Sequence, residues 1–118
     1  MGHLSTHVLD TMHGGPAVGM KVALQRANAD QFENLRTLTL NQDGRNDGGP
    51  LLDSKSMAVG RYRLLFEVAL YFRSRGVDLP DPAFLDVVVL DFGIADVNGH
   101  YHVPLLVTPW AYSTYRGS

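Results

Sequence analysis

The chain reads HYHVPLLV over residues 100–107, and large apolar side chains stand at every second position of this stretch. These are Tyr101, Val103, Leu105 and Val107. Because successive side chains of a strand point to opposite faces, the four are expected to face a core. His100 and His102 are then expected to point away from that core. The stretch predicts a strand with one buried face and one face that carries histidine.

Upstream stretches predict further strands. Apolar residues alternate with others at Met20, Val22 and Leu24, and again at Tyr62, Leu64 and Phe66. The run 84–92 holds four consecutive apolar residues at 87–90, which predicts a central strand covered on both faces. Glycine, proline, asparagine and aspartate gather between the runs, at 13–16, 43–50, 78–82 and 98–99. Short strands at this spacing predict a mainly β sandwich or barrel.

One short helix is expected over residues 68–75. Val68, Leu70, Tyr71 and Phe72 form its predicted apolar side. Gly76 follows as a suitable stop for a helix. The alternative is that 68–72 continues the preceding strand.

The composition limits the classes of partner. A chain of 118 residues is most simply one domain, 1–118. Its net charge of -2 gives no reason to expect nucleic acid or an anionic membrane as partner. No apolar run approaches the ~20 residues of a membrane span. The segment 1–7 lacks the features of a signal peptide, so a cytoplasmic location is expected, with a processed form as the alternative.

Two histidines are the first candidates for chemistry. If Leu4, Thr6 and Val8 face the core, His7 points away from it, as His102 does. An exposed histidine without a role is the alternative for each. The pair His100 and His102 also shares a face, as some zinc sites require. The chain has no cysteine, and no carboxylate completes an obvious ligand set in sequence, so a metal site is not expected.

Arg45 and the chain end are the remaining candidates. Arg45 follows a turn signal, and its planar guanidinium suits a carboxylate-like edge of a ligand. A solvated turn arginine is the commoner case. The sequence ends in Tyr115, Arg116, Gly117 and Ser118, and Tyr115 suits a planar ring, whether as a wall or as a hydroxyl donor. A packing aromatic near an edge is the alternative.

Three stretches together carry a family resemblance. They are 7–10 followed by 15–17, then 41–45, and finally 100–106 through 118. In this order and at this length, the chain resembles the transthyretin-like family, in particular the 5-hydroxyisourate hydrolases within it. The resemblance implies a sandwich of two four-stranded antiparallel sheets with one short helix after the fifth strand. It also implies a homotetramer, a dimer of dimers.

The resemblance further implies an activity and a site. The activity is hydrolysis of 5-hydroxyisourate to 2-oxo-4-hydroxy-4-carboxy-5-ureidoimidazoline in urate degradation, without a cofactor. The matching positions imply His7, Arg45, His102 and Ser118 as catalytic residues, and His7, Arg45, Tyr115 and Arg116 as substrate-binding residues. One histidine would activate water, and the residues do not decide which. The alternative is a non-catalytic carrier that holds a small aromatic ligand in the channel of a transthyretin-like tetramer.

Overall fold

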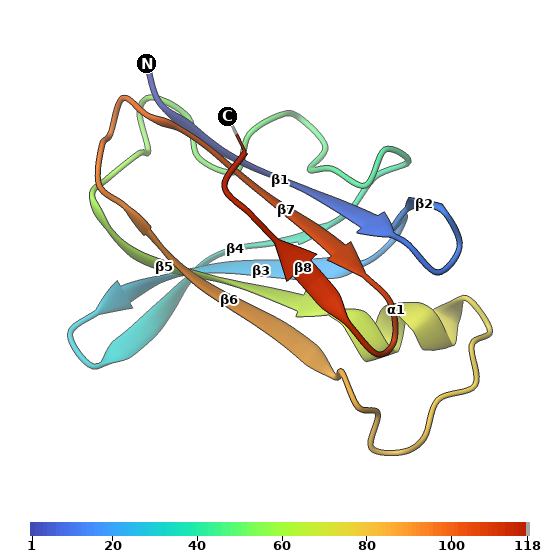
Figure 1. Ribbon diagram of the computed structural model, residues 1–118. Coiled ribbons are helices and arrows are strands. Elements are labelled where there is room, and N and C mark those ends of the chain that lie inside the picture. Colours follow the sequence, from blue (N-terminus) through green and yellow to red (C-terminus); the bar gives the residue numbers. More distant parts are fainter. Residues whose placement is uncertain (118) are drawn as a thin grey trace.

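Two sheets lie face to face in the computed structural model, which describes residues 1–117 (Figure 1). The elements are β1 (His3–Asp10), β2 (Gly15–Pro16), β3 (Lys21–Asn28), β4 (Gln31–Thr39), β5 (Gly60–Glu67), α1 (Val68–Ser74), β6 (Val87–Ile94), β7 (His100–Val107) and β8 (Tyr112–Thr114). The strand order is β2-β1-β7-β8 in one sheet and β4-β3-β5-β6 in the other. The predicted mainly β, two-sheet fold with one helix after the fifth strand is confirmed.

One pair of neighbouring strands departs from the expected antiparallel arrangement. The strands β1 and β7 run parallel, whereas the other paired strands are antiparallel. In this parallel register His3 lies beside His100, Ser5 beside His102 and His7 beside Pro104. The pairing therefore brings both ends of the sequence to the middle of one sheet.

The core lies between the two sheets, as the alternation predicts. Both sheets contribute buried apolar side chains to it. They include Leu4 and Val8 of β1, Val22 and Leu24 of β3, Tyr62, Leu64 and Phe66 of β5, and Tyr101, Val103, Leu105 and Val107 of β7. His7 and His102 are half-buried on the opposite face of their sheet. The sequence-based placement of both histidines outside the core is confirmed.

The strand β6 is an edge strand, and its prediction as a central strand is wrong. Val88 and Leu90 are buried, but Val89 between them is 41% exposed. Apolar residues on both faces of a strand indicate that both faces are covered in the assembled protein. They do not show whether the same chain or another one provides the cover. Here the chain covers one face of β6 and leaves apolar side chains open on the other.

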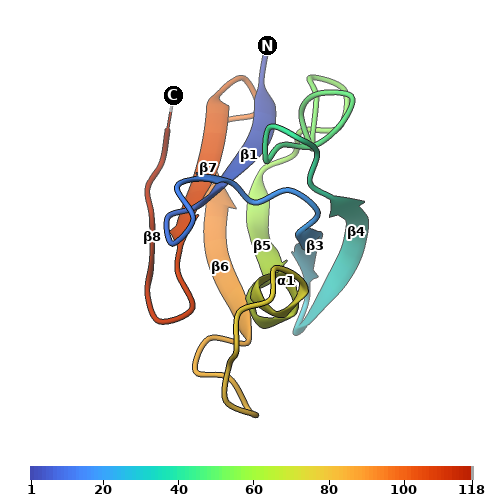
Figure 2. The same cartoon turned by 90° about the vertical axis from the view of Figure 1, so that its right-hand side faces the viewer.

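The helix α1 lies at the end of the molecule away from the N-terminus and the last described residues (Figures 1 and 2). It ends at Ser74, and Gly76 follows with a φ of 82°, a left-handed conformation that glycine adopts without strain. Val68, Tyr71 and Phe72 are buried as predicted, but Leu70 is 54% exposed. Of the described residues, no helix is long and apolar enough to cross a membrane.

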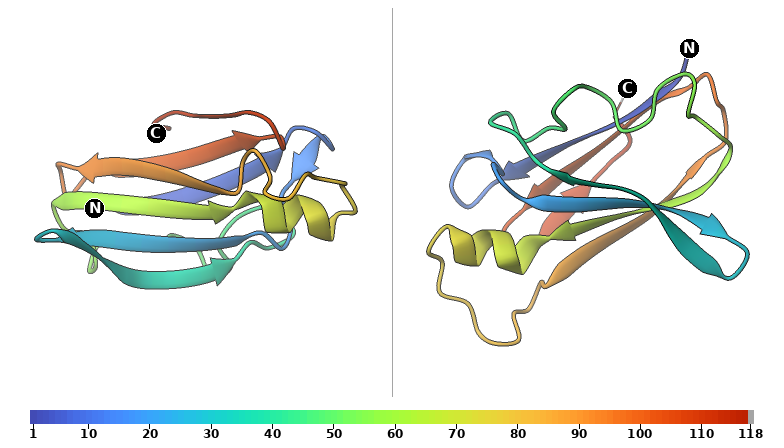
Figure 3. Two further views of the ribbon diagram at one scale, coloured as in Figure 1. Left: turned by 90° about the horizontal axis from the view of Figure 1, so that it is seen from below. Right: turned by 180° about the vertical axis from the view of Figure 1, so that it is seen from behind.

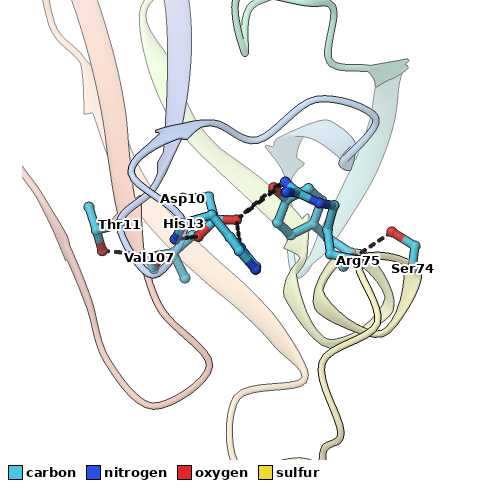
Figure 4. A network of polar contacts seen from close by, with 7 residues as sticks. Asp10, Thr11, His13, Ser74, Arg75 and Val107 are labelled. Atoms are coloured by element: carbon cyan, nitrogen blue, oxygen red, sulfur yellow. Dashed lines mark hydrogen bonds and ion pairs between the residues drawn. The ribbon is translucent and has the colours of Figure 1, made fainter.

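A polar network joins this helix to the end of β1 (Figure 4). The fully buried Asp10 accepts hydrogen bonds from the hydroxyl of Tyr71 at 2.8 Å and from the backbone of His13 at 2.9 Å. The His13 ring lies 2.6 Å from the same carboxylate, and Arg75 lies 3.7 Å away. Burial raises the pKa of Asp10, but the hydrogen bonds from His13 and Tyr71 outweigh it, and the pKa is lowered overall. The carboxylate is therefore charged and well partnered at neutral pH.

Candidate active site

The outer face of β1 and β7 carries a cluster of imidazoles. The parallel register places Ser5 beside His102, and the Ser5 Oγ lies 2.8 Å from Nδ1 of that ring. His7 follows two positions along β1 on the same face. The two histidines named by the sequence therefore belong to one surface, although 95 positions separate them in the chain.

The loop 41–45 brings Arg45 to His7. The side-chain oxygen of Asn41 accepts hydrogen bonds from the backbone of Asp43 and of Arg45. Gly44 has a φ of 72°, and a Cβ on it would lie 2.5 Å from the carbonyl oxygen of Val8. Only glycine lets the loop approach β1 so closely. The result is an antiparallel bridge between His7 and Arg45.

Both imidazoles are held neutral. Burial lowers the pKa of His7, and the positive charge of Arg45 lowers it further, although a hydrogen bond with the Asp43 backbone and the charge of Asp43 act in the opposite direction. Burial also lowers the pKa of His102, followed by the charges of Arg45, His7 and His3. A neutral imidazole has one nitrogen that accepts a proton and one that donates. The pair can thus supply both a base and a hydrogen-bond donor at neutral pH.

A cavity of about 280 Å³ adjoins this cluster. Its lining includes His3, Ser5, Arg45, Asn46 and Pro50. Arg45 contributes a cation to this lining, whereas His7 and His102 are not among the lining residues. A cation beside neutral imidazoles is an arrangement suited to stabilising an oxyanion.

The chain end meets the site through its backbone. Gly117 donates a hydrogen bond from its N–H to the carbonyl of His102 at 2.7 Å. A Cβ on Gly117 would lie 2.8 Å from Cδ2 of the His102 ring, so the glycine allows the tail to pack against the imidazole. Ser118, a predicted catalytic residue, lies outside the described residues.

Tyr115 and Arg116 are not brought to the histidines in this chain. The Arg116 guanidinium lies over the Tyr101 ring, 4.2 Å from its centroid, and donates to the His100 carbonyl. Tyr115 is 62% exposed and, with Arg116, lines another cavity of about 490 Å³ beside β6. Tyr101 faces the core, so the two tail residues are on the opposite side of β7 from His102. Their substrate-binding role stays a prediction.

The structure does not support the alternative of a metal site at His100 and His102. Across residues 1–117 no group of three or more histidine, cysteine, aspartate or glutamate side chains is arranged to hold a metal ion. The His100 ring lies against that of His3 at a tilt of 33°, with centroids 4.2 Å apart, and its Nε2 lies 2.9 Å from the Met1 carbonyl. His102 is turned to Ser5 instead.

Ser5 is the site residue that the sequence did not predict. Its only sequence signal is its position two residues before His7, on the same face of the strand. The contact with His102 depends on a parallel pairing between residues 97 positions apart. Nothing in a single sequence specifies that register.

The fold agrees with the comparisons to known proteins. The profile of the HIUase/Transthyretin family matches residues 4–117. The chain belongs to the HIUase/Transthyretin family. Among its relatives, 5-hydroxyisourate hydrolase 2 of Rhizobium meliloti (strain 1021) is 56% identical, over 99% of this chain and 97% of that protein.

Solved structures of the HIUase/Transthyretin family include an enzyme and a ligand complex. The 5-hydroxyisourate hydrolase of Klebsiella pneumoniae is 36% identical with a TM-score of 0.77, over 100% of both chains. Sea bream transthyretin in complex with thyroxine is 25% identical with a TM-score of 0.83, over 97% of this chain and 93% of that one. The transthyretin-like fold expected from the sequence is confirmed.

Proposed function

We propose that this chain is an enzyme that hydrolyses 5-hydroxyisourate to 2-oxo-4-hydroxy-4-carboxy-5-ureidoimidazoline, a step of urate degradation. The observation that carries the proposal is the outer face of β1 and β7, where two neutral histidines lie beside the guanidinium of Arg45. Relatives that share this full length are named 5-hydroxyisourate hydrolases. Hydrolysis of an activated cyclic amide needs a base and charge stabilisation, and this surface offers both.

His7 is the proposed general base. Burial lowers the pKa of His7 and the charge of Arg45 lowers it further, so the ring is neutral near pH 7. One nitrogen of a neutral imidazole carries a lone pair. That lone pair takes a proton from water as the water oxygen attacks a ring carbonyl of the substrate. The same proton can pass to the ring nitrogen that leaves when the C–N bond breaks.

Arg45 and His102 are the proposed partners of the developing oxyanion. Attack by water turns the carbonyl oxygen into an anion, and donors already in place lower the energy of that state. Arg45 is exposed and lies next to His7, so its guanidinium can reach a ligand in the adjoining cavity. We also propose that Ser118 completes the site, and that Tyr115 and Arg116 contribute to binding once the tail meets a neighbouring subunit.

A homotetramer, arranged as a dimer of dimers, belongs to the same proposal. The strands β6 and β8 are edges of their sheets, and Val89 of β6 and Tyr112 of β8 are exposed. Edge strands with exposed apolar residues favour pairing with a second copy. A partner over the outer face of β1 and β7 would exclude water from the histidines. The cytoplasmic location stays a prediction of the sequence.

The direct test generates 5-hydroxyisourate from urate with urate oxidase and follows its decay by absorbance, with and without this protein. We expect the decay to be faster in proportion to the protein concentration. A decay rate equal to the spontaneous rate at every protein concentration would contradict the proposed activity.

The carrier alternative rests on the fold shared with sea bream transthyretin, solved in complex with thyroxine. Fold alone does not set function, and the histidine pair with Arg45 favours hydrolysis. Calorimetry with thyroxine distinguishes the two: a carrier binds it tightly and leaves the decay of 5-hydroxyisourate unchanged.

A further inference from the structure

The hydroxyl of Ser5 touches the imidazole of His102 from the neighbouring strand. The Ser5 Oγ lies 2.8 Å from Nδ1, a normal hydrogen-bond distance. Both residues are half-buried on the outer face, and they are directly paired in the parallel register of β1 and β7. The contact is therefore set by two strands in the middle of a sheet and not by a loop.

The surroundings of Ser5 decide which group donates the proton. A serine hydroxyl both donates and accepts, so the distance alone allows either direction. Within residues 1–117 the hydroxyl has no hydrogen-bond partner other than Nδ1 of His102. If the ring donated from Nδ1, the hydroxyl proton would have no protein acceptor. Donation from Ser5 to an unprotonated Nδ1 uses that proton within the protein, and such a hydrogen bond contributes net stability.

The surroundings of His102 agree with a neutral ring. Burial lowers its pKa, the charge of Arg45 in the loop 41–45 lowers it further, and a proton on His7 or His3 of β1 would act in the same direction. A neutral imidazole holds one proton, so a ring that accepts at Nδ1 carries its proton on Nε2.

We infer that Ser5 is a positioning residue that donates a hydrogen bond to Nδ1 of His102, so that this histidine presents its Nε2–H to the substrate as a donor and not as a base. This inference rests on the proposed hydrolase function. It assigns the donor role to His102, whose Nδ1 is occupied by the Ser5 hydroxyl, and leaves the role of base to His7. The donor side of His102 then faces the oxygen that becomes negative during attack by water.

The chain offers a matched control at the next residue of the same strand. Thr6 also donates a hydroxyl hydrogen bond from β1 to β7, to the carbonyl of Val103 at 2.7 Å. Its side chain is buried on the core face, opposite to Ser5. Replacement of Thr6 by Val removes a bond of the same kind between the same strands and leaves His102 alone.

The experiment measures the tautomer of His102 by long-range proton–nitrogen NMR on the intact protein without substrate. It then measures kcat and KM for 5-hydroxyisourate hydrolysis. We expect the wild-type ring to carry its proton on Nε2 near neutral pH. Ser5→Ala should mix the tautomers and lower kcat about 10-fold with KM little changed, the loss expected for one hydrogen bond. Ser5→Thr keeps a hydroxyl and should restore both, whereas Thr6→Val should lower the thermal midpoint without changing the tautomer of His102.

A wild-type ring protonated on Nδ1 would overturn the inference, and so would Ser5→Ala with the wild-type tautomer and kcat. The wild-type and Ser5→Thr measurements decide the matter even if Ser5→Ala fails to fold. The tautomer is measured without turnover, so an inactive wild-type protein would count against the proposed function and not against the Ser5–His102 bond.

Discussion

Burial lowers the pKa of both His7 and His102, and the nearby guanidinium of Arg45 lowers both further. The Ser5 hydroxyl contacts the ring of His102, with which Ser5 is paired across the two strands. Two chemically identical side chains can therefore take different roles, because the partner of one ring nitrogen fixes what the other can do.

Replacing either histidine by asparagine should remove most turnover and leave the fold intact. Loss of one acid–base group typically costs about 10²- to 10⁴-fold in rate. Because the two act in one step, the double variant should lose less than the product of the single losses. Stopped-flow decay of 5-hydroxyisourate, with circular dichroism as the control for folding, checks both. A folded His7→Asn or His102→Asn variant that turns over substrate at the wild-type rate would contradict the role of that residue.

The rate should fall on the acid side with a midpoint below about 6.5, the ordinary pKa of histidine. Both pKa values are lowered, so the neutral rings persist to a lower pH, and protonation of His7 removes the base only there. Arg45→Gln removes one cause of that lowering, so its midpoint should move to higher pH even as its rate drops. The measurement is kcat/KM against pH after correction for spontaneous decay. A profile that is flat from pH 5 to 8 would argue against a histidine base.

The elements that hold the site differ in how far the sequence predicts them. The alternation in β1, β3, β5 and β7 predicts which faces are buried, because each strand pairs a covered face with an open one. The helix is predicted by its glycine stop and its apolar side. The sequence does not predict that β6 is an edge strand. Its apolar residues on both faces would be the same whether this chain or a second copy covers them.

The buried Asp10 links the end of β1 to α1 through its hydrogen bonds. Asp10→Asn should lower the free energy of unfolding by about 2 kcal/mol, the size of a hydrogen bond to a charged group. The folded-state pKa is lowered, so this stabilisation is present above the unfolded pKa of about 3.9 and is lost as the pH falls through the folded value. The difference between wild type and variant should shrink at strongly acid pH. Urea unfolding at pH 7 and pH 3 measures it, with Asp30→Asn, an exposed carboxylate of the β3–β4 turn, as the matched control. An equal loss of unfolding free energy in the two variants would mean that the Asp10 network does not stabilise the fold.

At the scale of the whole molecule, the N-terminus and the last described residues lie at the same end, and the β3–β4 hairpin projects from the body (Figure 3). The site lies where distant parts of the chain meet: β1 from the start, the loop 41–45, and β7 with the tail that follows β8. The sequence predicted the chemical groups from these parts. Gly117 contacts His102, whereas the Arg116 side chain lies over the Tyr101 ring. The sequence could not predict these two contacts, because they depend on the path of the backbone after the short strand β8.

Removing the last four residues, to leave a chain that ends at Thr114, should abolish activity at little cost in stability. Tyr115 is 62% exposed, and the contact of Arg116 with the Tyr101 ring is of a kind worth about 0.5–1 kcal/mol at an exposed site. The truncation also removes the hydrogen bond from Gly117 to the His102 carbonyl and the backbone that packs on the His102 ring. The test compares thermal midpoint, particle size by light scattering and hydrolysis rate, with Arg116→Ala in the full-length chain as the control for the lost guanidinium. We expect a folded, inactive particle of unchanged size. An active truncated protein would contradict the place of the tail in the site, and an inactive particle of smaller size would assign the tail to assembly instead.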